Sequence, residues 1–146
     1  MTKLLLASLL TMMVSSNGWF TNLDEAKATA VKNNQLILIN FSGSDWCGPC
    51  VRMHKEIFDS EVFKVFANDN LVLLNADFPR QRKNQLSKAQ QKENDHLAEL
   101  YNPEGKFPYT VLITTDGKVL KDWDGYPREG MSGFMEEIKQ VVSARN

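Results

Sequence analysis

The chain has 146 residues, of which 42% are hydrophobic and 24% are charged, and its formal net charge is −1 at pH 7. This length and apolar content predict one folded domain with its own core and exclude an intrinsically disordered chain. A chain this close to neutrality has no broad basic field, so nucleic acid is excluded as a partner.

The first 16 residues have the layout of a secretory signal peptide. Lys3 supplies an early positive charge, residues 4–14 are dominated by Leu and Met, and small polar residues follow. This apolar run is shorter than the about 20 residues that a membrane-spanning helix needs. We therefore predict a signal peptide over 1–16, a domain over 17–146 and a periplasmic or otherwise extracytoplasmic location. A buried N-terminal helix of the domain is the alternative.

Helical and strand patterns alternate along the rest of the chain. Helices are expected where apolar residues recur every three or four positions, and strands where short apolar runs lie between polar loops. In chain order the pattern predicts a helix over 23–31, a strand over 36–41, a helix over 48–58, a helical piece around 62–66, a strand over 71–76, a helix over 85–101, strands over 109–114 and 119–123, and a helix over 131–144. This order predicts an α/β fold with a central mixed sheet flanked by helices, antiparallel at its final hairpin.

Side-chain patterns predict where two of these helices start and which positions of a third are apolar. Asn22 stands where it can cap the helix over 23–31. Either Asp59 or Ser60 can cap the helical piece that follows. The helix over 85–101 is expected to turn its apolar positions inward, namely Leu86, Ala89, Leu97 and Leu100.

The only two cysteines of the chain, Cys47 and Cys50, are separated by two residues and follow a predicted buried strand. Gly48 permits the sharp turn that a disulfide between them requires, and Pro49 favours the first turn of a helix. A disulfide that closes so short a loop stabilises the fold little. We therefore interpret the pair as a redox site rather than as a structural crosslink.

The start of a helix at this pair predicts different reactivities for the two thiols. The thiolate is the attacking species in disulfide exchange, and the positive end of the helix dipole favours a thiolate at Cys47. Cys50 lies one turn into the helix and is expected to be more enclosed. We therefore predict that Cys47 forms the mixed disulfide with a substrate and that Cys50 resolves it. The carboxylate of Asp45 opposes the thiolate, and its exposure screens that effect.

The sequence also contains candidate ligands for a metal ion and a small group of basic residues. A structural zinc ion takes four protein ligands, and the chain has no further cysteine to add to the pair. His54 follows Cys50 by four residues and is the nearest candidate for a third ligand, whereas His96 is distant in sequence. We therefore expect no metal site and interpret His54 as a partly exposed helix residue. The basic residues within 80–83 are expected to lie in a solvated loop.

The string Trp46-Cys47-Gly48-Pro49-Cys50 after an apolar strand resembles the active site of the thioredoxin family. The resemblance covers the chain from about residue 23 to residue 142 and implies a thioredoxin fold. It also implies catalytic roles for the two cysteines, with the Gly-Pro spacer shaping the site and the Trp46 ring as a surface for a substrate chain.

A second part of the resemblance is Phe107-Pro108, which precedes a predicted strand as the cis-proline loop does in that family. It implies that Pro108 is cis and faces the disulfide, and that the Phe107 backbone pairs with an extended substrate. Two residues depart from the family pattern, because Phe107 is bulky and Asn40 stands where thioredoxins carry a buried Asp. Since Asn cannot act as a carboxylate base, water or a group such as Glu56 is expected to handle the Cys50 proton.

Together these features predict a thiol–disulfide oxidoreductase that acts on protein disulfides through a mixed disulfide at Cys47. It would need a redox partner to reset the pair and no metal or organic cofactor, and we expect a monomer. The Gly-Pro spacer resembles that of reducing members of the family and favours reduction. Two alternatives stay open: a disulfide isomerase or oxidant that uses the same residues, and a non-redox module that binds client proteins.

Overall fold

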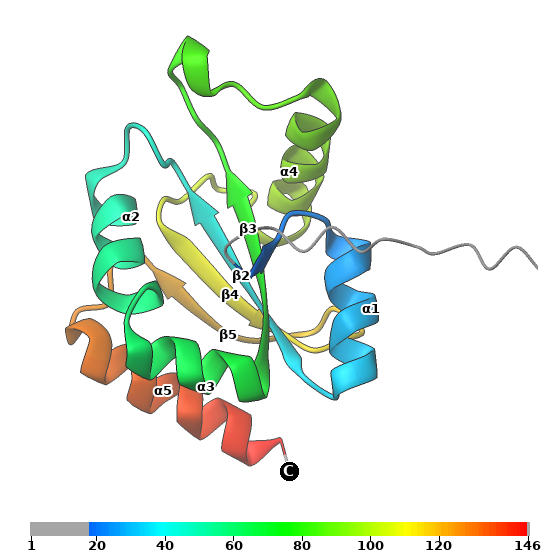
Figure 1. The fold of residues 1–146 in the computed structure, drawn as a ribbon, viewed down its shortest axis with the longest axis vertical. Helices are drawn as coiled ribbons and strands as arrows, with labels where there is room; N and C mark the ends of the chain where they lie inside the picture. The colour runs from blue at the N-terminus through cyan, green and yellow to red at the C-terminus, as the bar shows by residue number, and fades with distance from the viewer. Residues whose placement is uncertain (1–17, 146) are drawn as a thin grey trace, which may run out of the picture.

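Residues 18–145 are described by a computed structural model, in which helices cover both faces of a five-stranded sheet (Figure 1). The predicted signal peptide over 1–16 lies outside the described residues and stays a prediction. The strands are β1 (Trp19–Phe20), β2 (Leu36–Ser42), β3 (Leu71–Asp77), β4 (Tyr109–Ile113) and β5 (Val119–Asp124). The helices are α1 (Leu23–Asn33), α2 (Gly48–Met53), η1 (His54–Phe58), α3 (Glu61–Asn70), η2 (Arg82–Asn84), α4 (Lys88–Tyr101) and α5 (Gly130–Ala144).

Strand β2 is central, because every one of its residues is buried and it has a neighbour on each side. The strand order is β1-β3-β2-β4-β5, with β2 parallel to β3 and antiparallel to β4. This arrangement confirms the predicted mixed sheet with an antiparallel hairpin at its edge. In open α/β sheets, sites form beyond the carboxyl ends of such central strands, and the cysteine pair follows β2 at that end.

Two apolar clusters, one on each face of the sheet, hold the layers together. Helices α2, α3 and α5 cover one face and α1 and α4 cover the other (Figure 1). Phe58, Phe63 and Phe134 are the large buried side chains of the first cluster, and Phe41 and Leu97 belong to the second. Burying a side chain of this size contributes about 1.5–3 kcal/mol. Within residues 18–145, no helix has the length and apolar content that crossing a membrane requires.

Side-chain caps start two helices at predicted positions. The Asn22 side chain accepts a hydrogen bond from the Glu25 backbone N–H at 3.0 Å, which confirms the predicted cap of α1. The Ser60 hydroxyl accepts from the Phe63 backbone N–H at 3.2 Å, so Ser60 rather than Asp59 caps α3.

Helix α4 begins three residues later than predicted. The Ser87 hydroxyl accepts a hydrogen bond from the Gln90 backbone N–H at 3.1 Å and caps the helix there. A serine side chain that accepts from the first free N–H groups of a helix fixes where the helix starts. The prediction placed the start at Gln85 because it followed the apolar pattern rather than this cap.

The buried face of α4 also differs from its prediction. Leu97 is buried, but Leu100 is 51% exposed. Instead, Asn94 is buried and its amide donates to the Asp77 carbonyl oxygen at 2.8 Å. Because a hydrogen bond to the end of β3 offsets the cost of burying this amide, a polar residue takes an inward position that hydrophobicity alone does not reveal.

The short strand β1 was not predicted. It consists of two residues that pair in parallel with β3, with Trp19 opposite Leu73. Two residues are too few to show a strand periodicity. Trp19 is partly buried and packs against Phe58 with ring centroids 5.1 Å apart.

Candidate active site

The two cysteines lie where the chain passes from β2 into α2. They form a disulfide, and Cys47 is the N-cap residue of α2. The Cys50 backbone N–H donates to the Cys47 Sγ at 3.3 Å. Cys47 is 5% exposed and Cys50 is 0% exposed, so the second cysteine is the more enclosed one, as predicted. Gly48 and Pro49 form the exposed first turn of the helix between them.

Trp46 is fixed on several sides next to the disulfide. Its indole N–H donates to the Phe78 carbonyl oxygen at 2.7 Å, and its ring packs edge-on against Phe107 at a centroid distance of 5.4 Å. The Arg80 guanidinium lies 3.6 Å from the ring centroid. A Cβ on Gly43 would lie 2.3 Å from the ring, so the ring can sit here only because residue 43 is glycine.

The loop after β3 is part of this site rather than an independent solvated segment. Arg80, Arg82 and Lys83 are all exposed, as predicted, and Arg80 also covers one face of Trp46. Phe107 packs edge-on against Phe78 with ring centroids 5.4 Å apart. The bulk of Phe107 therefore has a structural reason, because it fills the space between two aromatic rings beside the disulfide.

Asp45 anchors that loop. Its carboxylate accepts from the backbone N–H groups of Arg80 and Gln81, each at 2.9 Å, and from the Asn84 amide at 3.0 Å. These donors, led by the Arg80 N–H and the Asn84 amide, lower the pKa of Asp45 below its usual range. Fixed N–H donors thus stabilise the charge of the Asp45 carboxylate. We had expected solvent exposure to screen this charge from Cys47.

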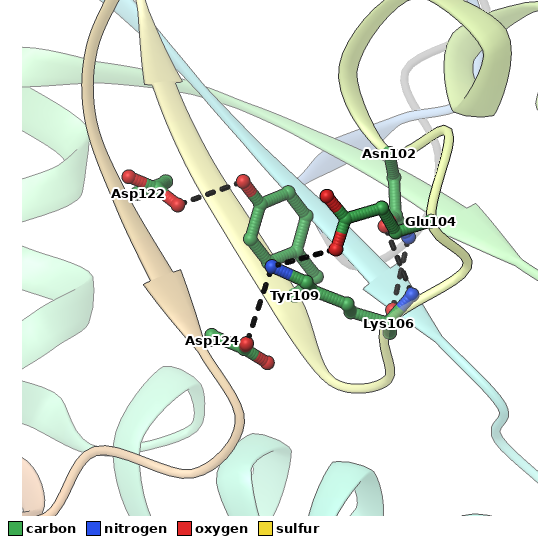
Figure 2. A network of polar contacts seen from close by, with 6 residues as sticks. All are labelled: Asn102, Glu104, Lys106, Tyr109, Asp122 and Asp124. Atoms are coloured by element: carbon green, nitrogen blue, oxygen red, sulfur yellow. Dashed lines mark hydrogen bonds and ion pairs between the residues drawn. The ribbon is translucent and has the colours of Figure 1, made fainter.

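The Phe107–Pro108 peptide bond is cis, as the family resemblance implied. The segment before it is clamped, as Figure 2 shows. The Asn102 amide donates to the Lys106 carbonyl oxygen at 2.9 Å, and its oxygen accepts from the Lys106 N–H at 2.9 Å. This reciprocal pair, with Asn102 buried, fixes the approach of the chain to Phe107.

Charged side chains secure the same turn at the surface. The Lys106 ammonium lies 3.3 Å from carboxylate oxygens of both Glu104 and Asp124 (Figure 2). The Tyr109 hydroxyl donates to Asp122 at 2.7 Å. Partial burial, followed by that bond to a carboxylate, raises the pKa of Tyr109 to about 12. These contacts join the cis-proline loop and the start of β4 to β5.

A polar network links the sheet to η1. The Asn40 amide donates to the Thr110 hydroxyl at 3.0 Å, and its oxygen lies 3.1 Å from the His54 Nε2. Asn40 and Thr110 are buried, at 1% and 0% exposed, and His54 is half-buried. Burial lowers the pKa of His54 below its usual range, because charging the ring would require desolvation. His54 is therefore partly exposed, as expected, and it also belongs to a hydrogen-bonded network that the sequence did not reveal.

Glu56 occupies a different environment. It is exposed, pairs with Arg52 at 3.1 Å and accepts a hydrogen bond from the Tyr126 hydroxyl. The Tyr126 and Arg52 bonds lower the pKa of Glu56. These bonds hold the carboxylate at the surface, so Glu56 is not placed as the proton acceptor for Cys50 that we expected.

No metal site is found within residues 18–145, where no three His, Cys, Asp or Glu side chains cluster closely enough to hold an ion. Both cysteines are already joined in the disulfide, and His54 faces Asn40. His96 is exposed, with Glu99 as its nearest ionic neighbour at 4.0 Å.

The structure brings the two predicted segments, residues 46–50 and 107–108, together through the packing of Trp46 against Phe107. Sequence reasoning missed three contributors, Arg80, Thr110 and His54. Arg80 and Thr110 gave no signal, because their roles depend on the packing of distant segments. The position of His54 four residues after Cys50 was a signal, but only the strand next to it shows what the ring binds.

Comparisons with known proteins agree with this geometry. A family model described as "Thioredoxin-like" matches residues 18–113. The chain is 32% identical over 121 residues to "Disulfide bond reductase DsbH" of Chlamydia pneumoniae, covering 83% of this chain and 70% of that protein. It is also 30% identical over 64 residues to "Thioredoxin-related protein DsbJ" of the same organism. This match covers 44% of this chain and only 18% of that protein.

Solved structures give the same result for the fold. One described as "DsbH Oxidoreductase" superimposes with a TM-score of 0.77 at 27% identity, covering 97% of this chain and 95% of that one. A disulphide isomerase from Xylella fastidiosa Temecula1 superimposes with a TM-score of 0.60 at 18% identity, covering 91% of this chain and 99% of that one, and supports the fold alone. The thioredoxin fold predicted from the motif is confirmed.

Proposed function

Because the chain belongs to the thioredoxin-like family and is a thiol–disulfide oxidoreductase, we propose that it reduces disulfides of other proteins outside the cytoplasm. The observation that carries this proposal is the extended likeness to a protein named as a disulfide bond reductase, over 83% of this chain, together with a cysteine pair at a helix start. The signal-like first 16 residues support the extracytoplasmic location.

In the proposed reaction the reduced protein begins with Cys47 as a thiolate. The thiolate attacks one sulfur of a substrate disulfide, the substrate S–S bond breaks, and its other sulfur leaves as a thiolate. The Cys50 thiol then loses its proton and attacks the Cys47 sulfur, which breaks the mixed disulfide and releases the second substrate thiolate. The Cys50 N–H that donates to the Cys47 Sγ supports these roles, because the same donor stabilises a thiolate there.

Substrate binding is assigned to the surface around the pair. Trp46 and Phe107 supply an aromatic wall, and the cis Pro108 lies in the loop that continues it. An extended substrate segment would lie against this wall, with its backbone paired to that of Phe107. Such binding would present the substrate sulfur to Cys47.

The disulfide itself is the redox centre in this mechanism, which calls for no metal or organic cofactor. Each turnover leaves Cys47 and Cys50 oxidised, so a separate dithiol protein must return two electrons to the pair. Protein disulfides and that reductant are the two partners that the proposed cycle requires, with the protein acting as a monomer.

The test combines turnover with the reduction potential of the pair. Cys47→Ser should abolish insulin reduction, whereas Cys50→Ser should stall at a covalent complex with its client, which mass spectrometry identifies. A reduction potential close to that of thioredoxin, about −270 mV, supports a reductase. A potential close to that of a strongly oxidising pair, about −120 mV, overturns the reductase proposal in favour of oxidation or isomerisation. Covalent complexes trapped by Cys47→Ser alone would reverse the two cysteine roles.

A further inference from the structure

One titratable side chain beside the disulfide has no part in the reaction described above. His54 follows Cys50 by four residues, so the two side chains lie on adjacent turns of one helical face. The His54 backbone N–H donates to the Cys50 carbonyl oxygen, and the π-helical segment begins at this residue. π-Helical turns inside a helix are often found at functional sites.

The hydrogen bonds of Asn40 fix the orientation of the His54 ring. The Asn40 amide nitrogen donates to Thr110, so its oxygen faces the His54 Nε2 at 3.1 Å and accepts from it. A neutral ring that carries its proton on Nε2 has its lone pair on Nδ1. The network therefore assigns Nδ1 as the basic nitrogen of a side chain one turn from a fully buried cysteine.

We propose that His54 accepts the proton that Cys50 loses when it resolves the mixed disulfide, directly or through one water molecule, and that Asn40 positions its ring. The inference rests on the oxidoreductase chemistry of the pair. The Cys50 S–H bond breaks, its proton moves to Nδ1, and the sulfur electron pair forms the bond to Cys47. The bond between Cys47 and the substrate breaks, the electron pair leaves on the substrate sulfur, and the proton on His54 returns to solvent.

The surroundings of His54 keep the ring neutral and able to accept a proton near pH 7. Burial lowers its pKa, and the carboxylates of Asp59 and Asp77 act in the opposite direction but more weakly. Lys64 lines the same cavity as His54 and Asp59. Since the pKa is lowered, the ring is a competent base at neutral pH and loses that capacity as the pH falls through the lowered value.

Resolution can be measured in isolation by mixing the reduced protein with dithiobis(nitrobenzoate) in a stopped-flow instrument. The first release of coloured thiolate reports the attack by Cys47 and depends on concentration. The second release reports the intramolecular attack by Cys50 and does not. We expect the wild-type second phase to vary little with pH near neutrality and to fall in acid as His54 becomes protonated.

The decisive variant is His54→Gln, with the exposed His96→Gln as its matched control. At pH 7 the second phase of His54→Gln should be slower by about 10-fold or more. It should then rise about tenfold per pH unit until an ordinary thiol ionises near about pH 8.5. The first phase, and both phases of His96→Gln, should match the wild type. A His54→Gln second phase that superimposes on the wild-type profile overturns the proposal.

A measurement on the unaltered protein guards against misfolding of the variant. The acid inflection of the wild-type second phase should coincide with the pKa of His54 measured by NMR on the reduced protein. A clear mismatch overturns the role of His54, whatever the variant does. Neither result depends on whether the protein works as a reductase or as an oxidant, since that question is decided by the reduction potential.

Discussion

Replacing Gly43 with Ala should loosen the aromatic wall beside the disulfide and destabilise the protein. The new Cβ would lie 2.3 Å from Cε2, 2.5 Å from Cζ2 and 2.6 Å from Nε1 of Trp46. Ordinary carbon contacts are about 3.5–4.0 Å, so the ring must move by roughly 1 Å. It cannot move freely, because it is hydrogen-bonded to Phe78 and covered by Arg80.

The size of the effect follows from those contacts. Losing the indole hydrogen bond costs about 0.5–1.5 kcal/mol, and weakening an exposed cation–π contact costs up to about 1 kcal/mol. Overpacking a filled site typically costs about 1–3 kcal/mol. We therefore expect Gly43→Ala to lower the free energy of unfolding by about 1–3 kcal/mol and to raise the KM for a protein disulfide.

Urea unfolding followed by tryptophan fluorescence measures the loss, with an unchanged m value showing that the same surface is exposed. Gly48→Ala is the matched control, because a Cβ at Gly48 meets nothing within 4 Å. The reasoning is refuted if Gly43→Ala stays within about 0.5 kcal/mol of the wild type, the range of ordinary surface substitutions. Equal destabilisation by both variants would also refute it, because the clash at Trp46 would then explain nothing.

Two further predictions concern the loop anchor and helix α4. Asp45→Ala should release residues 80–84, and hydrogen exchange of their backbone amides should become faster. Because N–H donors lower the pKa of Asp45, the anchor of the wild-type protein should be fully formed above the usual carboxyl pKa range. It should be lost as the pH falls through the lowered pKa. Slow exchange retained in the variant would contradict this anchor. Leu97→Ala should lower the free energy of unfolding, measured in urea, by about 2–5 kcal/mol. The control Leu100→Ala, at an exposed position, should change it by no more than about 0.5 kcal/mol. Comparable losses in both variants would contradict the buried face of α4.

The sequence predicted those parts of the fold that depend on short-range patterns. The almost continuous apolar run of β2, the Asn22 cap and the antiparallel final hairpin each carry their signal within a few residues, because local sterics and burial decide them. Helix α4 shows the limit of such signals. The Ser87 cap competed with an apolar pattern that ran further back, and hydrophobicity placed Leu100 rather than Asn94 on the inward face.

The chemistry of the site divides in the same way. Cys47, Cys50 and the turn between them were evident from sequence, because their spacing and the helix start at Gly48 lie within five residues. The chain by itself therefore determined the redox centre and the family, and it predicted the attacking and resolving roles of the two cysteines. Only the tertiary structure brought His54 to Asn40 and Arg80 onto Trp46. Those contacts join residues that lie on different elements or far apart along the chain. Sheet register and packing, rather than any local propensity, decide which of these side chains meet.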